Sequence, residues 1–359
     1  MVLKRLELSK FRNFSNLQLD FNEGLNVIIG QNGVGKTNIV EAIHYLSLAR
    51  SFRTNYDDAL IKHGQEEATI KAYLDDEHRT HKIEITIGKD GKRVRHNDIP
   101  LTRLSTLAEL VNVVVFEPKD VNFFNGPPSL RRNYLDVHLG KTKNLYLNGL
   151  STYENLLRER NAALKKDNID TIEIDVLQAQ MVEASEVVTK GRAEFIRNLN
   201  EILPKVLKEL DPSLANIKVN YKPFVTLKGD YKTNAEAVFN KAKANDYKYR
   251  STSVGPQRED FITELNGQDV SEYASQGQKR IIALALAISP YFIATNRQKR
   301  PIIVLDDALS ELDANHQQRL VKFINKFNQT FITTTSFPYQ GSELYEVTKN
   351  QKVIRRRFV

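Results

Sequence analysis

The chain contains no cysteine among its 359 residues. A disulfide framework and thiolate metal sites are therefore excluded, and a reducing compartment such as the cytoplasm is compatible with the composition. Residues 1–11 contain no apolar run long enough for a secretory signal. The most apolar stretch, residues 281–294, contains Pro290 and is too short to cross a bilayer. We therefore expect a buried helix there, and no membrane partner.

Acidic residues are in deficit, because 52 Lys and Arg stand against 44 Asp and Glu, for a net charge of +8. This excess favours an anionic partner such as nucleic acid, although it is spread along the chain and many soluble basic proteins bind none. The length is sufficient for a large core and favours two packed units.

The most informative segment, residues 30–37, reads Gly-Gln-Asn-Gly-Val-Gly-Lys-Thr, the pattern of a phosphate-binding loop. A strand-like apolar run precedes it at residues 25–29, and a helical apolar stripe follows at residues 37–49. Glycines let backbone N–H groups turn toward a polyphosphate, and the helix N-terminus adds positive potential. The expected nucleotide contacts are Gly30, Gln31, Asn32, Gly33, Val34, Gly35, Lys36, Thr37 and Asn38. The alternative is an ordinary strand-to-helix turn.

A second nucleotide motif is the apolar strand at residues 302–305, which runs directly into two acids, Asp306 and Asp307. A strand of this kind delivers its acid to the sheet edge where a Mg²⁺-nucleotide lies. We expect Lys36 to reach the β- and γ-phosphates, Thr37 and Asp306 to hold Mg²⁺, and Asp307 to act on the attacking water as a base or positioning group. Lys36 and Asp307 are thus the catalytic candidates. A strand end capped by solvated acids is the alternative.

The whole chain shows an α/β pattern that is interrupted by one long segment of helices alone. Short strand signals fill residues 1–118 and return after Pro212, whereas residues from about 129 to 210 show apolar positions three or four apart. We predict an ATPase-type nucleotide-binding head with a mixed sheet, formed by residues 1–118 and 212–359, and an inserted α-helical, short coiled-coil-like arm at residues 119–211. The helices could instead form a layer on the same core.

A third motif, Ser275-Gln276-Gly277-Gln278, stands at the start of a predicted helix, and Ser310-Glu311-Leu312-Asp313 follows the acid strand. The chain thereby resembles the ATP-binding cassette class. In that class the signature helix start binds a γ-phosphate held by another subunit, so Ser275, Gly277 and Gln278 become nucleotide contacts in an ATP-dependent homodimer. The alternative is a capped helix start.

At finer grain the chain resembles the RecF family of bacterial recombination mediators, related to chromosome-structure-maintenance heads. Besides the motifs above, the segments that carry the resemblance are Phe11-Arg12-Asn13-Phe14, Ala49-Arg50-Ser51-Phe52-Arg53, Gly126-Pro127-Pro128, Arg131-Arg132-Asn133-Tyr134-Leu135-Asp136, Gly255-Pro256-Gln257-Arg258-Glu259-Asp260-Phe261 and Leu305-Asp306-Asp307-Ala308-Leu309-Ser310-Glu311-Leu312-Asp313. The resemblance implies a cytoplasmic ATPase that uses ATP and Mg²⁺ and hydrolyses ATP slowly, with stimulation by DNA. It also implies a dimer on double-stranded DNA near single-strand gaps, and cooperation with RecR and RecO in loading RecA.

Some positions depart from the family pattern. Lys119 stands where the family usually has an acid, and Gln257 where a His is usual. We find no glutamine-loop Gln near residues 111–120 and no switch His after the strand at residues 330–335, where Thr334 or Thr335 could contact the γ-phosphate instead.

The candidate DNA contacts are all arginines and are expected to bind phosphates, because nothing resembles a base-reading element. They are Arg131 and Arg132 at the start of the insertion, Arg50 and Arg53 after the phosphate-loop helix, and the tail Arg355-Arg356-Arg357. Arg50 and Arg53 could touch nucleotide instead, and a terminal Arg run is often disordered. Two other functions stay open: a transporter ATPase subunit and a non-hydrolysing ATP-dependent clamp.

Overall fold

Alternating apolar and polar residues build the first sheet, which we describe from a computed structural model. The structure describes residues 1–76, 79–294, 300–310, 312–339 and 342–358. The sheet is antiparallel throughout, in the order β2-β1-β4-β5-β6-β7. Its strands are β1 (Val2–Phe11), β2 (Phe14–Asp20), β4 (Glu67–Asp75), β5 (Thr80–Gly88), β6 (Gly91–His96) and β7 (Ile99–Pro100). Every second residue of β4 and β5 is buried, which leaves one face of the sheet polar.

A second six-stranded sheet carries the nucleotide motifs, in the order β15-β14-β3-β13-β12-β8. Its strands are β3 (Gly24–Ile29), β8 (Val113–Phe116), β12 (Ile302–Asp306), β13 (Gln329–Thr334), β14 (Ser342–Val347) and β15 (Val353–Phe358). All neighbours pair in parallel except β15, which is antiparallel to β14. The carboxyl ends of β3, β12 and β13 therefore meet at one edge, where ligands of open α/β sheets bind.

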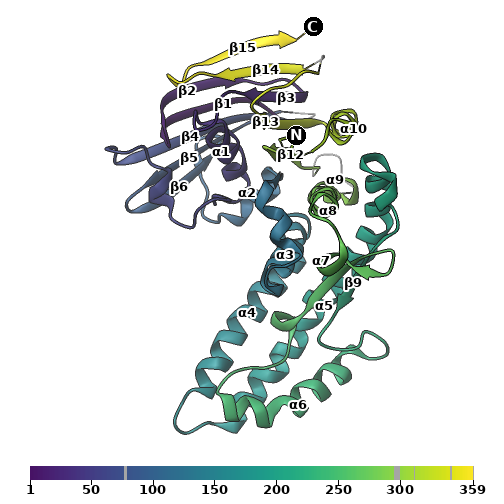
Figure 1. Ribbon diagram of the computed structural model, residues 1–359. Coiled ribbons are helices and arrows are strands. Elements are labelled where there is room, and N and C mark those ends of the chain that lie inside the picture. The colour runs from purple at the N-terminus through teal and green to yellow at the C-terminus, as the bar shows by residue number, and fades with distance from the viewer. Residues whose placement is uncertain (77–78, 295–299, 311, 340–341, 359) are drawn as a thin grey trace. The chain divides into compact units, whose positions relative to one another are not determined.

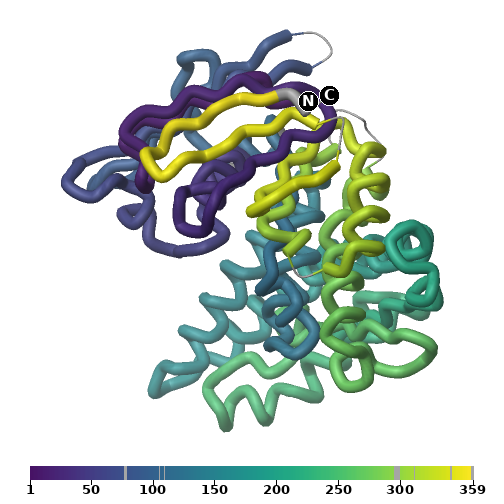
Figure 2. Tube along the Cα trace, turned by 45° about the horizontal axis from the view of Figure 1, so that its top comes forward, coloured from purple at the N-terminus to yellow at the C-terminus, as the bar shows by residue number. Residues whose placement is uncertain are grey.

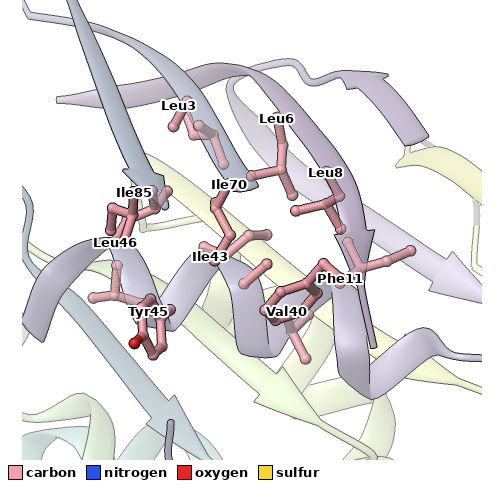
Figure 3. Packing of buried hydrophobic residues seen from close by; sticks show 14 of the residues in the cluster. Leu3, Leu6, Leu8, Phe11, Val40, Ile43, Tyr45, Leu46, Ile70 and Ile85 are labelled. Carbon is pink, nitrogen blue, oxygen red and sulfur yellow. The ribbon is translucent and has the colours of Figure 1, made fainter. Parts of the chain in front are cut away.

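Helix α1 (Lys36–Leu48) packs against both sheets. Figure 3 shows its side chains Val40, Ile43 and Leu46 facing Leu6 and Ile70 of the first sheet. The same buried cluster includes Ile28, Val304 and Phe331 from the second sheet. The core that supports the phosphate loop is thus shared by the two sheets.

Strands from the N-terminal and C-terminal parts of the chain are neighbours, as the purple and yellow strands of Figure 2 show. Tyr345 donates its hydroxyl to the carbonyl of Asp20 over 2.8 Å, and the Gln329 amide donates to the carbonyl of Leu3 over 2.8 Å. The tail Arg355-Arg356-Arg357 forms part of β15, so it is an ordered strand rather than a disordered end.

The chain divides into two compact units, which are described separately (Figure 1). Unit 1 holds residues 1–121, 205–215 and 276–359, and unit 2 holds residues 122–204 and 216–275. This division differs from the predicted boundaries at 118/119 and 211/212, because residues 216–275 fold with the helical unit. The remaining elements of unit 1 are η1 (Asp57–Leu60), α2 (Ser105–Leu110), η2 (Pro118–Phe123), η3 (Pro212–Leu214), α8 (Gln276–Ile288), α9 (Pro290–Ile293) and α10 (Ala314–Ile324).

Unit 2 contains the predicted helices and a small antiparallel sheet in the order β11-β10-β9. Its elements are α3 (Pro128–Thr142), α4 (Asn144–Leu164), α5 (Thr171–Leu210, which continues into unit 1), β9 (Ile217–Lys222), α6 (Tyr231–Tyr249), η4 (Pro256–Arg258), β10 (Asp260–Leu265), β11 (Gln268–Asp269) and α7 (Val270–Tyr273). The apolar stretch at 281–294 forms α8 and α9, broken at Pro290. Among the described residues, no helix is long and apolar enough to cross a membrane.

Candidate nucleotide-binding site

The phosphate loop connects the end of β3 to the first turn of α1, as its sequence predicts. Gly35 has φ +113°, and a Cβ there would lie 2.6 Å from Nδ2 of Asn13. A Cβ at Gly30 would lie 2.6 Å from the carbonyl oxygen of Val347 on the neighbouring strand. Both positions accept only glycine, because any side chain would displace a packed neighbour.

Lys36 is the first residue of α1, and it is largely buried. Its Nζ donates to the carbonyls of Gly30 over 2.7 Å and Gln31 over 2.9 Å. Burial lowers the pKa of this ammonium, while Asp307 and Asp306 act to raise it. The loop thus folds around the Lys36 ammonium group, which would face the β- and γ-phosphates of a nucleotide.

Asn13, from the turn between β1 and β2, forms hydrogen bonds with the phosphate loop and with the first turn of α1. Its Nδ2 donates to the carbonyl of Val34 over 3.0 Å, and its Oδ1 accepts from Nδ2 of Asn38 over 2.8 Å. The neighbouring Arg12 binds Glu41 of α1 through two bonds of 2.8 and 2.6 Å. The Phe11-Arg12-Asn13-Phe14 segment therefore fixes the position of both the loop and its helix.

The acid pair lies at the carboxyl end of β12, directly opposite the loop helix. Oδ1 of Asp306 accepts hydrogen bonds from Thr37 over 3.1 Å and from Thr333 over 2.6 Å. Burial raises the pKa of Asp306, and the two threonine bonds act to lower it. Asp307 has φ +50°, an uncommon conformation for a non-glycine residue, and its N–H donates to Oγ1 of Thr333 over 2.9 Å. Thr37 and Asp306, far apart in sequence, are thus in direct contact.

The donor set at this point suits Mg²⁺. A threonine hydroxyl and a carboxylate supply two oxygen ligands, and Mg²⁺ usually adds waters and nucleotide phosphates to such a pair. Among the described residues, no group of three or more His, Asp or Glu could hold a metal ion.

The signature segment begins with an exposed serine. Ser275 directly precedes α8, and Gln276 and Gly277 in its first turn are also exposed. The segment after the acid strand is held by Ser310, whose hydroxyl donates to the carbonyl of Asp307 over 2.9 Å, and by Asp313, which caps α10. Glu311 lies outside the described residues. These helix starts could receive a phosphate from a second subunit.

The threonine that contacts the acids is not one that the sequence indicates. Thr334 donates its hydroxyl to the carbonyl of Ser336 over 3.0 Å, and Thr335 is exposed. Thr333 makes the contacts with Asp306 and Asp307 described above. A β-strand alternates its faces, so only the pairing of β13 with β12 shows which threonine reaches the acids. A contact of Thr334 or Thr335 with the γ-phosphate stays an untested prediction.

The candidate DNA contacts lie in different surroundings. Arg50 is exposed, whereas Arg53 donates to Oδ1 of Asn38 over 2.8 Å, next to the phosphate loop. Arg132 donates to the carbonyl of Glu259 over 2.8 Å. Arg131 has a side chain only 12% exposed and forms two bonds, of 2.7 and 2.9 Å, with Asp260.

Arg131 also donates to the carbonyls of Phe123, Phe124 and Gly126. The guanidinium is therefore engaged within unit 2, and a role in DNA contact at this position stays an untested prediction.

The helical unit holds a buried ionic network that the sequence did not reveal. Arg192 of α5 is 2% exposed and binds Asp136 over 2.9 Å and Glu259 over 2.7 Å. Thr189 donates to Glu259 over 2.8 Å. Two of the segments that carry the family resemblance, residues 131–136 and 255–261, thus meet in one structural cluster.

Comparisons with known proteins cover nearly the whole chain. The family model described as "RecF/RecN/SMC N terminal domain" matches residues 2–355. The DNA replication and repair protein RecF of Listeria welshimeri is 35% identical over 94% of this chain and 93% of its own length. Those of Streptococcus suis and Clostridium novyi are 36% and 38% identical, the former over 94% of both chains and the latter over 93% of both.

Solved structures of RecF are also similar to this chain. The recombination mediator protein RecF-ATP in the RecFOR pathway superposes with a TM-score of 0.89 and 30% identity, over 99% of this chain and 97% of that chain. The Smc head domain of Pyrococcus furiosus gives a TM-score of 0.57 at 16% identity, over 99% of this chain and 96% of that chain, a likeness of fold alone. The fold is therefore that of an α/β head of the cassette and chromosome-structure-maintenance type with a long helical arm.

Proposed function

Because this chain belongs to the RecF family of DNA replication and repair proteins, we propose that it is a weak, DNA-stimulated ATPase that acts as an ATP-dependent dimer on double-stranded DNA near single-strand gaps. In this proposal it works in the cytoplasm with RecO and RecR, and indirectly assists the loading of RecA. The support for a RecFOR context is the solved RecF-ATP structure, which is described as belonging to that pathway.

The observation that carries the proposal is the hydrogen bond of 3.1 Å between Thr37 and Asp306. It joins the first turn of the phosphate-loop helix to the acid strand, so one phosphate-bound cation can be held from both sides. A bound Mg²⁺ would neutralise charge on the β- and γ-phosphates. In this arrangement Lys36 binds the phosphates, Thr37 and Asp306 hold the cation, and Asp307 orients the attacking water.

The dimer follows from the exposed signature. Ser275 and Gly277 are exposed at the start of α8, where the positive potential of a helix N-terminus favours an anion. A γ-phosphate held by a second copy is the ligand that this helix start suits. ATP would then favour the dimer, and hydrolysis would release it.

The deciding experiment is gel filtration with ATP, with ADP and without nucleotide, each repeated with gapped double-stranded DNA. The dimer should form only with ATP, and DNA should elute with the dimer. If the elution volume of the protein and its co-elution with DNA were the same with ATP, with ADP and without nucleotide, the proposal would be contradicted.

The two alternatives are separable by simple assays. Turnover of ATP measured with and without DNA distinguishes a slow ATPase from a non-hydrolysing clamp. The transporter alternative finds no support in the family model, which is that of RecF, RecN and SMC proteins. A transporter subunit would also fractionate with membranes and show no affinity for DNA.

A further inference from the structure

His316 lies between two carboxylates that belong to different elements of unit 1. Its Nδ1 is 2.6 Å from Oδ2 of Asp313, the residue that caps the start of α10. Its Nε2 is 3.2 Å from Oδ2 of Asp211, which directly follows the last residue of α5. One imidazole ring therefore joins the start of α10 to the end of α5, across 105 positions of the sequence.

The two bonds of this ring are complete only when it is protonated. Among the contacts that the structure describes for the ring, the charged groups are Asp313 on α10 and Asp211 after α5. Hydrogen bonds from the backbone N–H and the ring of His316 lower the pKa of Asp313. Burial acts to raise the pKa of Asp211, but hydrogen bonds from Ser213 and His316 lower it below its ordinary value. Ionised carboxylates only accept hydrogen bonds, so both ring nitrogens must donate, as they do in an imidazolium.

The first turn of α10 also holds the segment that follows the acid strand. Gln317 donates its side-chain amide to the carbonyls of Leu309 over 2.8 Å and Leu312 over 2.9 Å. Ser310 in turn donates to the carbonyl of Asp307. The backbone after the acid pair is thus fixed by the same helix turn that carries the imidazole.

The last turn of α5 is joined to the α10 region at a second point. Nζ of Lys326, just beyond α10, lies 2.9 Å from Oε1 of Glu209. Both of these side chains are about half exposed, whereas the side chains of His316 and Asp211 are 25% and 19% exposed. Solvent and salt therefore screen the imidazole link less than the lysine link. The helix that receives both links, α5, is 40 residues long and begins in unit 2.

We propose that His316 is a positioning residue which, as an imidazolium, ties the end of α5 to the start of α10, so that a rearrangement of the acid-strand segment on nucleotide binding is passed to α5. A neutral ring keeps only one N–H and loses one of the two bonds, so the coupling weakens as the pH rises. This inference rests on the proposed ATP-dependent dimer and deepens it, because it adds a route by which the nucleotide acts on the long helix.

The test is hydrogen exchange of the full chain followed by mass spectrometry, with and without a non-hydrolysable ATP analogue and Mg²⁺. In the unaltered protein the analogue should slow exchange at residues 205–215 as well as at residues 312–320. His316→Gln and Asp211→Asn should reduce the slowing at 205–215 by about 2- to 5-fold, the size expected for one partly exposed ion pair, and retain the slowing at 312–320. Asp211→Asn keeps an oxygen that can accept from Ser213, so the cap of η3 is preserved.

His316→Arg keeps a positive charge and several N–H groups at every pH of the experiment. After correction for intrinsic exchange rates, its response at residues 205–215 should be the same at about pH 6 and about pH 8, whereas that of the unaltered protein should decrease toward pH 8. Asp230→Asn, which makes the same change in the residue that caps α6, is the matched control and should respond like the unaltered protein.

Two results would overturn the inference. One is an equal response at residues 205–215 in the unaltered protein, His316→Gln and Asp211→Asn. The other is a response of the unaltered protein that does not vary with pH. If the analogue slowed no exchange at the phosphate loop of the unaltered protein, the proposed ATP site would be refuted, and this inference with it.

Discussion

Thr333 and Asp306 lie on adjacent parallel strands, and the Thr333 hydroxyl donates a 2.6 Å hydrogen bond to Oδ1 of Asp306. The Thr333 hydroxyl oxygen also accepts a hydrogen bond of 2.9 Å from the backbone N–H of Asp307. One hydroxyl thus positions both acids, and the two acids have different surroundings. Asp306 is buried among hydroxyls, whereas Asp307 follows it in a left-handed conformation.

These surroundings predict separate effects of neutralising each acid. Asp306→Asn should weaken Mg²⁺-ATP binding by about 10-fold or more, because it removes a charged metal ligand. Asp307→Asn should preserve binding but slow hydrolysis by about 100-fold or more, and so trap an ATP-bound dimer on DNA. Calorimetry and single-turnover hydrolysis measure the two effects. An equal loss of binding in both variants would show that the roles are not separate.

Lys36→Met should abolish ATP-dependent DNA binding. The variant loses charged hydrogen bonds to the phosphates worth about 1.5–3 kcal/mol, or roughly 10- to 100-fold in nucleotide affinity. Fluorescence titration with a labelled ATP measures the change. Lys89→Met, at an exposed turn of the same unit, is the control. Unchanged affinity in a folded Lys36 variant would refute the assignment of the site.

Ser275→Arg should separate nucleotide binding from dimerisation. An arginine at this exposed helix start would occupy the place of the second subunit's γ-phosphate, while the phosphate loop of the same chain is unaltered. ATP affinity should therefore remain within about 2-fold, a change of under roughly 0.5 kcal/mol. Gel filtration with ATP should show only monomer.

Gln18→Arg, on the exposed side of β2, adds the same charge elsewhere and should dimerise normally. A Ser275→Arg protein that still dimerises with ATP would rule out the composite site.

DNA affinity should depend steeply on salt and little on base sequence. Each neutralised phosphate contributes a slope of about −0.9 in log K against log[salt], so a dimer with a few contacts per subunit should give about −4 to −8. Arg50→Glu should reduce the slope by about 2, because the dimer loses two contacts.

Fluorescence anisotropy at several salt concentrations, with ATP and then ADP, measures this slope. Changed ATP affinity in Arg50→Glu would instead place Arg50 at the nucleotide. Arg131 is unsuited to this test, because charge reversal there would also break its bonds with Asp260.

We expect the buried Lys141 to make the free energy of unfolding of the helical unit depend on pH. It is 6% exposed, and burial lowers its pKa from 10.5 to about 7. Between these values the unfolded chain binds more protons than the folded one, so the free energy of unfolding should rise from pH 7 toward pH 10. Lys141→Met should raise it at pH 7 by on the order of 1–3 kcal/mol, and the gain should shrink toward pH 10.

Urea unfolding followed by circular dichroism at several pH values measures this dependence. Lys241→Met, on the exposed side of α6, should leave the pH dependence as it is. A gain from Lys141→Met that does not vary with pH would contradict the explanation by burial of charge.

The secondary structure near the phosphate loop can be predicted from the sequence, because each strand, turn and helix there is specified by adjacent residues. The end of β12 at two acids and the start of α1 at Lys36 are of this kind. Contacts between distant segments are not readable in the same way. Asn13 reaches Val34, and Arg131 reaches Asp260 across 129 positions, through pairings that only the folded chain creates. The bonds of Arg131 with Asp260 are therefore not predictable from the sequence, and its contact with DNA stays an untested prediction.

The order of strands in the second sheet has a consequence for synthesis of the protein. Strand β3, which leads into the phosphate loop, lies between β13 and β14, and those strands come from the last quarter of the chain. Residues 122–275, by contrast, belong to unit 2 apart from the short segment 205–215. On a translating ribosome, the phosphate loop must therefore wait for its neighbouring strands until about 347 residues have been polymerised, because long-range strand pairing requires both partners. A nascent chain halted before that point would carry every residue of the glycine loop and still be unable to retain a nucleotide.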